Sequence, residues 1–398
     1  MKIKQLDIKG FRSLYDVSWK PGDLNIVIGP NGSGKSNLLK VLDLLTLSAR
    51  GRLGKQVQRE GGMEPLVWDG RAPQISFRIV TSSLGSNQNK RERLVYRLNL
   101  VRLGMSSTYR IEHEQFRRYR KSSLDDDRIS RSKLIERTPR QAVIFDEREK
   151  AQVAPKESVP EDETLLSLAS EPFAVNPLIA AYHNTLSSWR IYQDFQTHRE
   201  APVRQPVITR SEFFVAPDGH NLISVLHTLY TGNRDFKRNL NDAMSAAFGD
   251  DFEELIFPPA ADQRIQLRVR WKSLQREQTT ADLSDGTLRF LLLITILANP
   301  DPPALIAIDE PATGLHPSML PIIAEYAAGA ALRSQVIMTT HSADFLDAFG
   351  SSPPTTTVMK WQDGKTCLQI VSDESLHYWL NEYTLGKMYR SGELEEME

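Results

Sequence analysis

The chain has very little cysteine: one residue, Cys367, among 398. A single cysteine excludes an internal disulfide framework and fits a reducing compartment, so we expect a cytoplasmic protein. Long apolar runs are also missing. No stretch approaches the length that crosses a bilayer, and the first residues alternate like a strand instead of forming the apolar core of a signal peptide. We therefore expect no membrane partner.

An excess of one charge is lacking as well, because 49 basic and 50 acidic residues leave a net charge of -1. A balanced charge does not call for nucleic acid, so any basic footprint must be local. The eight histidines show no spacing that is typical of a zinc site. The rest of the composition, 40% hydrophobic and 25% charged, is that of a globular protein, and the length allows roughly two or three domains.

What the sequence does contain is a glycine-rich loop at residues 29–36, of the form G-x-x-x-x-G-K-S, which is the P-loop motif. The apolar residues 24–28 before it predict a buried strand, and leucines at helical spacing follow it. In this context backbone N–H groups surround phosphate oxygens. We expect Lys35 to reach the β- and γ-phosphates and the Ser36 hydroxyl to ligate Mg²⁺. The nucleotide-binding candidates of the loop are Asn31, Gly32, Ser33, Gly34, Lys35, Ser36 and Asn37.

Two carboxylates follow a second apolar run, residues 304–308. Such a run predicts a strand of a parallel sheet, which places Asp309 and Glu310 at the carboxyl edge, where α/β folds bind ligands. We expect Asp309 to hold Mg²⁺, directly or through water, and Glu310 to polarise the water that attacks ATP. The plain alternative is an ordinary acidic pair at a strand end, and the nearby P-loop makes it the weaker interpretation.

Two further segments predict parts of the same site. Residues 284–297 predict a buried helix, and the serine and glycine at its tip, Ser284 and Gly286, form a second anion site. Another apolar strand, residues 335–340, ends at His341, which can hydrogen-bond a γ-phosphate or the attacking water. A lone histidine is usually structural, but its place after this strand favours a catalytic role. Together the motifs predict an α/β fold with a mainly parallel sheet at the P-loop.

Other segments alternate apolar and polar residues and predict antiparallel strands. They are residues 74–80, 93–100 and 108–112. Residues 263–271 also alternate and predict a further strand.

From about residue 114 to 175, charged residues dominate and show little periodicity. Within this segment, basic side chains interleave with aromatic rings, as in a nucleic-acid contact. Three aspartates at 125–127 oppose that interpretation, so we favour a solvated arm or interaction surface. The basic side chains in question are Arg117, Arg118, Arg120 and Lys121.

The motifs follow one another as P-loop, L-S-x-G-x-x-R, I-D-E-P, G-L-H-P and T-T-H-S. This order resembles the ABC-type ATPases of the SMC and RecF branch. It resembles more closely the predicted ATPases grouped with overcoming-lysogenization-defect (OLD) nucleases and bacterial anti-phage systems. The opening KIKQLDIKGFRSL, residues 218–222 and residues 383–386 share the resemblance, which covers most of the chain apart from 114–175. An aspartate and a threonine stand where the transporter signature has glycine and glutamine, as expected for this branch.

The resemblance implies an ABC-type ATPase head with a mixed sheet, an antiparallel β lobe and an inserted charged and helical segment. It implies that two heads sandwich ATP, with the P-loop of one facing Ser284 and Gly286 of the other. It places Arg12 near the nucleotide and makes Gln193 the candidate for the glutamine loop. The cofactors that it implies are ATP and Mg²⁺. The partners are a second copy of the chain and a separate effector, a nuclease or a toxin.

We expect three parts: an N-terminal lobe over residues 1–113, a charged insertion over 114–187 and a C-terminal lobe over 188–398. The favoured function is slow ATP hydrolysis by a head-to-head dimer that switches a separate effector in anti-phage defence. Two alternatives stay open. One is a RecF- or SMC-like DNA-repair ATPase that binds DNA directly. The other, which the long insertion disfavours, is the nucleotide-binding subunit of a transporter.

Overall fold

The computed structural model describes residues 1–84, 92–104, 108–121, 129–146, 150–155, 160–169, 176–350, 353–371 and 384–393. The aspartates at 125–127, Tyr383 of the C-terminal motif and the side chain of Lys121 lie outside this description. Among the described residues, every helix is too short or too polar to cross a membrane.

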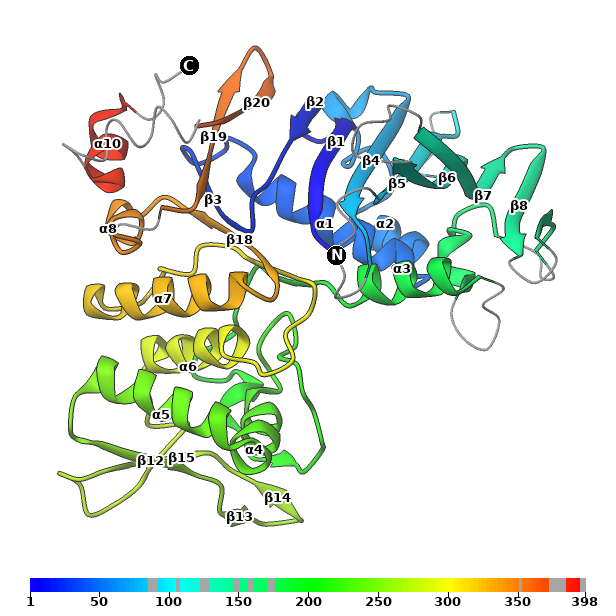
Figure 1. Cartoon of the computed structure of the whole chain (residues 1–398). Helices are drawn as coiled ribbons and strands as arrows, with labels where there is room; N and C mark the ends of the chain where they lie inside the picture. Colours follow the sequence, from blue (N-terminus) through cyan, green and yellow to red (C-terminus); the bar gives the residue numbers. More distant parts are fainter. Residues whose placement is uncertain are drawn as a thin grey trace.

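A six-stranded sheet contains the P-loop strand and divides the molecule (Figure 1). The strand order is β10-β17-β18-β3-β19-β20, and all neighbours run parallel except the hairpin β19–β20. The apolar runs that precede the P-loop and Asp309 are β3 and β17, and β18 lies between them. The strands are β3 (Leu24–Ile28), β10 (Arg190–Tyr192), β17 (Leu305–Ile308), β18 (Gln335–Thr340), β19 (Thr355–Gln362) and β20 (Lys365–Ile370).

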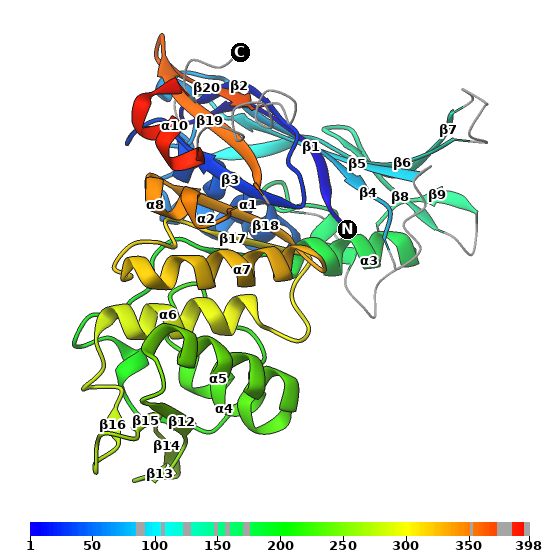
Figure 2. The same ribbon diagram turned by 60° about the vertical axis from the view of Figure 1, so that its left-hand side comes forward.

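The central strands are buried on both faces, because alternate side chains enter two different hydrophobic cores. In β3, Ile26 and Ile28 join one core, and Val27 joins the other. Such two-sided burial is why these strands are continuous apolar runs. Helices α1 (Lys35–Ala49) and α3 (Pro177–Ser187) lie on one side of the sheet. On the other side lies α7 (Leu320–Ala331), with α6 (Asp285–Leu297) behind it (Figures 1 and 2).

An eight-stranded antiparallel sheet forms the lobe beside α1, in the order β2-β1-β4-β5-β6-β7-β8-β9. Its strands are β1 (Ile3–Phe11), β2 (Leu14–Trp19), β4 (Gln74–Ser82), β5 (Glu92–Arg102), β6 (Tyr109–Lys121), β7 (Ile129–Thr138), β8 (Gln141–Asp146) and β9 (Ala151–Val153). The predicted meander is therefore present and is longer than expected.

Residues 114–175 show little periodicity in the sequence, but the described residues among them form regular structure. Strand β6 runs through the expected boundary at 114, and β7, β8 and β9 extend the same sheet. Two features hide the alternation from the sequence. Glu114 occupies an inward position, and the pairing of β6 with β7 shifts register between Phe116 and Arg117. A register shift of this kind breaks the two-residue period that identifies a strand.

Glu114 is fully buried and ties the sheet to the segment that follows it. Its carboxylate accepts hydrogen bonds from the Tyr96 hydroxyl at 2.9 Å, from Leu165 N at 2.6 Å and from Leu166 N at 3.0 Å. Next to these residues, the Thr164 hydroxyl donates to Ser48 O in α1 at 2.8 Å. Burial raises the pKa of Glu114, and the hydrogen bonds oppose that shift. The carboxylate thus replaces an apolar side chain as the link between the outer strands and α1.

We predict that Glu114→Gln lowers the free energy of unfolding by about 1–3 kcal/mol, because the amide group turns a donor toward donors that the carboxylate satisfied. Since the folded pKa is raised, the glutamate's own contribution to stability is fully present below its ordinary pKa of 4.5 and is lost as pH rises through the folded pKa. The variant should therefore differ more from the parent at pH 5 than at pH 7.5, as measured by urea denaturation.

The matched control is Glu112→Gln on the same strand, where the carboxylate makes a partly exposed ion pair with Arg110 at 2.9 Å. That change should cost less than about 1 kcal/mol. Equal losses for the two variants, or a Glu114→Gln effect that grows with pH, would contradict the role given to Glu114.

Between β10 and β17 the chain forms a helical lobe with two three-stranded sheets, β11-β14-β13 and β12-β15-β16. The single strand expected over 263–271 is wrong. The chain passes from one small sheet to the other at Gln266 and Leu267, so two short strands form. The elements are α4 (Leu222–Gly232), α5 (Arg234–Phe248), β11 (Val207–Ile208), β12 (Phe252–Ile256), β13 (Pro259–Ala260), β14 (Arg264–Ile265), β15 (Arg268–Trp271) and β16 (Gln278–Thr279). The first lobe also contains α2 (Leu53–Arg59).

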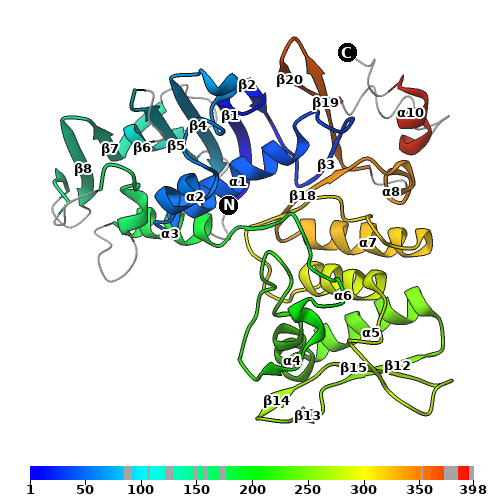
Figure 3. The same ribbon diagram turned by 180° about the vertical axis from the view of Figure 1, so that it is seen from behind.

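The C-terminal helix α10 (Leu385–Ser391) packs against the short helix α8 (Ala343–Asp347), as Figures 1 and 3 show. A side chain on Gly386 would collide with the carbonyl oxygen of Ala343, so only glycine permits this approach. Gly386 N donates to Asp347 Oδ1 at 2.7 Å. Arg390 pairs with Asp344 and Asp347, both at 3.0 Å. The helix α10 is thus fastened along α8.

Candidate functional site

The glycine loop after β3 has a packed side and an open side. Gly29, Gly32 and Gly34 have φ angles of 146°, 83° and 104°, which only glycine adopts readily. A Cβ on Gly34 would lie 2.7 Å from the Ser13 hydroxyl, so this position tolerates no side chain. A Cβ on Gly32 would meet nothing within 4 Å, and Asn31 and Gly32 are exposed. The loop is therefore accessible to a ligand at its tip.

Two residues that the sequence did not single out hold the packed side. The Thr366 hydroxyl donates to Ser33 O at 2.8 Å and lies 2.8 Å from the Ser13 hydroxyl. The Asn37 side chain also donates to Ser13, at 2.8 Å. Ser33 itself is buried, and its hydroxyl has no partner among the described residues. Of the predicted loop residues, Asn37 and Ser33 therefore face the protein.

Lys35 is buried and bends back over the loop, where its ammonium group donates to Gly29 O at 2.7 Å and to Pro30 O at 3.2 Å. Burial lowers the pKa of Lys35, and the nearby carboxylates of Glu310 and Asp309 oppose the shift. The structure thus brings the lysine of the first motif close to the acidic pair of a motif about 270 residues later in the sequence.

Ser36 and Asp309 meet directly, with the serine hydroxyl 2.9 Å from Asp309 Oδ2. The other oxygen of Asp309 accepts a hydrogen bond from the Thr339 hydroxyl, and Asp309 N donates to Tyr192 O at 2.8 Å. The two residues predicted to bind a metal therefore present two adjacent oxygen donors, the ligand type that Mg²⁺ prefers. The aspartate is fixed by β10 and β18 on either side of β17.

Glu310 and His341 form a second pair at the same edge of the sheet. His341 Nδ1 lies 2.8 Å from Glu310 Oε1, and His341 N donates to Glu310 Oε2 at 3.2 Å. Glu310 has a positive φ of 48°, a conformation uncommon for a residue with a side chain, and its N–H donates to the Thr339 hydroxyl at 3.0 Å. Both predicted catalytic residues are thus held together beside Asp309.

Gln193 and Arg12 lie along the flank of α1 and line one cavity of about 540 Å³. Gln193 directly follows Tyr192, the residue whose carbonyl accepts from Asp309 N, so it stands beside the acidic edge. Arg12 has a φ of 47° and forms an ion pair with Glu60. The arginine side chain is therefore held by α2's end rather than pointing freely into the loop.

The helix tip at Ser284 is on the surface of the helical lobe. Ser284 is the N-cap of α6, and its hydroxyl accepts from Thr287 N at 3.1 Å. A Cβ on Gly286 would lie 2.6 Å from Gly314 O, so the glycine allows the loop after β17 to approach. The buried guanidinium of Arg204 pairs with Asp285 and donates to Leu283 O at 2.7 Å. Ser284 and Asp285 remain exposed.

Four supporting residues were missed by the sequence reasoning. Thr339 is the first threonine of T-T-H-S, and Ser13 stands in the opening motif, so both had a detectable signal. Thr366 and Arg204 had none, because they reach the loop and the helix tip from segments that are remote in sequence.

Residues 24–347 match the family described as "AAA domain, putative AbiEii toxin, Type IV TA system". The OLD nuclease of Thermus scotoductus is 42% identical over 43 residues, which are 11% of this chain and 8% of that protein. The chromosome partition protein Smc of Mycobacterium tuberculosis is 36% identical over 95 residues, 22% of this chain and 7% of that protein. The chain thus spans less than a tenth of the length of these curated relatives.

Two solved Smc heads share the fold. One, bound to the C-winged helix domain of ScpA, has a TM-score of 0.58 at 14% identity, over 95% of this chain and 100% of that chain. The other has an extended coiled coil and is bound to the C-terminal domain of ScpA derived from Pyrococcus furiosus. Its TM-score is 0.54 at 14% identity, over 96% of this chain and 98% of that chain. The predicted ABC-type head fold, with mixed and antiparallel sheets, is confirmed.

Proposed function

Because the chain belongs to the AAA domain family that residues 24–347 match, we propose that it is an ATPase head that binds and hydrolyses ATP with Mg²⁺. One observation supports this most: Lys35, Ser36, Asp309, Glu310 and His341 come from three separate motifs and meet at the carboxyl edge of one parallel sheet. Ligands of open α/β sheets bind at this edge.

In this proposal the loop N–H groups and Lys35 hold the triphosphate, for which the lysine must exchange its bonds to Gly29 O and Pro30 O for phosphate oxygens. Ser36 and Asp309 hold the metal. Mg²⁺, when bound, neutralises charge that develops on the β- and γ-phosphates. Glu310 accepts the proton of the attacking water, and His341 orients Glu310 through the 2.8 Å contact. Gln193 takes a position beside the nucleotide, and Arg12 must leave Glu60 to do the same.

We further propose that two copies close around ATP, so that Ser284 and Gly286 of one complete the site of the other. The exposure of the helix tip and of Asn31 and Gly32 supports this pairing, because both surfaces are available to a second chain. Arg204, which is anchored in the lobe, keeps the tip in shape before the partner arrives.

The closed state is proposed to act as a switch that a separate polypeptide reads, in defence against phage. The family description names a toxin and a toxin–antitoxin system, and one short match is to an OLD nuclease. A solved head of the same fold is bound to a domain of another protein. We also propose that the chain has an N-terminal lobe, an inserted segment and a C-terminal lobe. The strands of the inserted segment continue the antiparallel sheet.

The alternative, direct DNA binding in the manner of a repair ATPase, is supported by the short matches to Smc. The basic strand β6 supports it less. Arg117 lies 3.6 Å from Glu136, and Arg118 lies 3.8 Å from Glu92, so part of its charge is compensated inside the sheet. Salt-sensitive binding of duplex DNA by the chain alone would favour this alternative.

The first test measures phosphate release from ATP by the purified chain. The second measures the molar mass of the protein by light scattering, with and without ATP. We expect slow Mg²⁺-dependent turnover and an ATP-dependent dimer. In the control, EDTA removes Mg²⁺, and ATP turnover should then be lost. Folded protein that neither binds ATP nor releases phosphate would overturn the proposal.

A further inference from the structure

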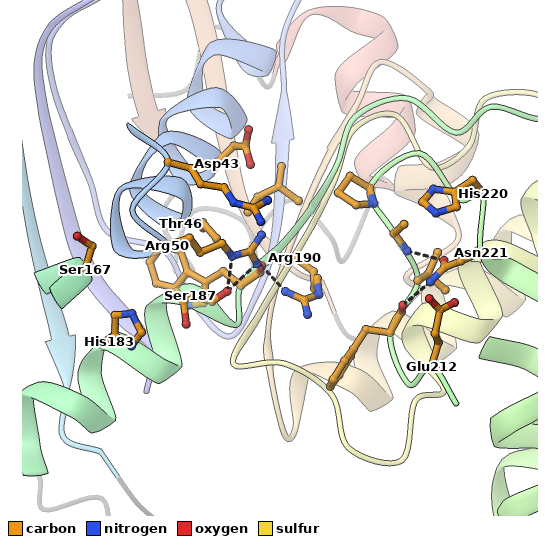
Figure 4. Close-up of a pocket in the computed structure, with 17 residues that line it drawn as sticks. Asp43, Thr46, Arg50, Ser167, His183, Ser187, Arg190, Glu212, His220 and Asn221 are labelled. Carbon is orange, nitrogen blue, oxygen red and sulfur yellow. Dashed lines mark hydrogen bonds between the residues drawn. The ribbon is translucent and has the colours of Figure 1, made fainter. Parts of the chain in front are cut away.

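A second cavity, of about 680 Å³, contains none of the P-loop residues. It shares part of its wall, including Arg50 and Arg52, with the cavity that Gln193 and Arg12 line. Its walls come from the end of α1, the end of α3 and the loop before α4 (Figure 4). That loop includes His220 and Asn221 of the motif at 218–222, to which the ATPase site gives no role. The volume is typical of a small-molecule pocket.

Arginines dominate the charge of this cavity. Arg50, at the end of α1, and Arg190, at the start of β10, come close together in the centre of Figure 4, and Arg52 lines the same cavity. Among the described residues, no carboxylate lies within ion-pair distance of any of the three guanidinium groups. The acidic residues that line the cavity are Asp43 and Glu212.

The charge of Arg50 is only partly compensated by its neighbours. Burial lowers the pKa of Arg50, Arg190 lowers it further, and the opposing effect of Asp43 is smaller than that of Arg190. Burial raises the pKa of Asp43 itself, against the attraction of Arg50. Like charges that are held together in a partly buried place cost free energy unless an anion joins them.

The end of α3 explains part of this arrangement. Arg50 donates to Ser187 O at 2.8 Å and to Trp189 O at 3.2 Å, and Arg190 donates to Ser188 O at 3.2 Å. Cations are favourable at a helix C-terminus. This capping uses only some of the N–H groups of each guanidinium, and Arg190 is further held over the ring of Phe214, 5.0 Å from its centroid. Arg52 is exposed and takes no part in the capping.

The opposite wall is also fixed. Asn221 accepts from Ala216 N at 2.8 Å and donates to Phe214 O at 3.1 Å, so its amide shapes the loop that faces the arginines. His220 is paired with Asp218 at 2.6 Å. The cavity therefore has the hydrogen-bonded loop before α4 on one side and the guanidinium groups of the arginines on the other.

We propose that this cavity binds a small phosphorylated molecule through Arg50, Arg52 and Arg190. Guanidinium groups present several N–H donors in a planar fork that matches phosphate oxygens. Strand β10 connects the cavity to the ATPase site, because Arg190 begins the strand and Tyr192, at its end, accepts a hydrogen bond from Asp309 N. A ligand held at Arg190 would thus sit one short strand from Gln193.

The test uses pyrophosphate as the probe and the full chain with Lys35→Ala, which disables the P-loop. Isothermal titration should detect pyrophosphate binding to this variant. Adding Arg52→Gln should weaken the binding about tenfold or more, since a charge-assisted contact is lost. Arg52 has no structural bond to lose, so its variant should keep the parent's melting temperature. Adding Arg238→Gln, a remote exposed arginine of α5, should change nothing.

Three results would overturn the proposal: no binding of pyrophosphate to Lys35→Ala, equal weakening by Arg52→Gln and Arg238→Gln, or no effect of either. A fourth concerns the source of the phosphate. If a single-stranded oligonucleotide without terminal phosphates binds at Arg52 more tightly than pyrophosphate, the site is for a nucleic-acid backbone and not for a small molecule. Since none of these measurements uses ATP turnover, their failure is separate from failure of the ATPase proposal.

Discussion

Glu310→Gln should lower the rate of ATP hydrolysis by about 10²–10⁴-fold and leave ATP affinity unchanged. The physical reason is that Glu310 is positioned by His341, at 2.8 Å, and by the bond of its own N–H to Thr339, and not by the phosphate loop. Glutamine keeps the shape of the side chain and loses the ability to accept a proton. With hydrolysis blocked, the ATP-bound dimer should accumulate, which light scattering would detect.

The control for this variant is Glu325→Gln, an exposed glutamate of α7. It should turn over ATP at the parental rate. If Glu310→Gln also hydrolyses ATP as fast as the parent, Glu310 is not the base. If it fails to bind ATP, the glutamate has a structural part in the loop, and the proposed division of roles is wrong.

Lys35→Ala should abolish nucleotide binding, because the ammonium group is the only cation that the described residues place over the loop carbonyls. Loss of a buried charge-assisted contact with phosphate costs about 1.5–3 kcal/mol for each hydrogen bond. Binding of a fluorescent ATP analogue would measure this loss. The variant also provides the means to test whether the site is shared between two chains.

For that test, Lys35→Ala is mixed with a Ser284→Arg chain, in which the helix tip carries a bulky cation. In a mixed dimer one site receives both defects, and the other receives an intact P-loop and an intact tip. Random mixing should therefore restore roughly a quarter of the parental turnover, although neither variant is active alone. Removal of the N-cap serine costs about 1 kcal/mol, which leaves the buried helix α6 folded. Mixed dimers that are shown to form and yet stay inactive would exclude a shared site.

The central sheet was predictable because its strands are buried on both faces, which makes continuous apolar runs that end in polar motif residues. The P-loop, Asp309 and His341 all follow such runs, so their convergence at one edge was also predictable. Thr366 was not, because it stands on a hairpin whose position depends on the fold. The outer strands β6–β9 were missed because a buried glutamate and a register shift interrupt their pattern. In both cases, contacts between segments that are distant in the sequence determine the structure, and the local sequence pattern does not reveal them.

The fastening of α10 to α8 has a consequence for control of the ATPase edge. Helix α8 has five residues, too few to be stable alone, and it begins two residues after His341. Its folding is therefore coupled to that of α10, through Gly386 and the ion pairs of Arg390. Release of α10 should therefore weaken α8 and, with it, the segment that holds His341 against Glu310.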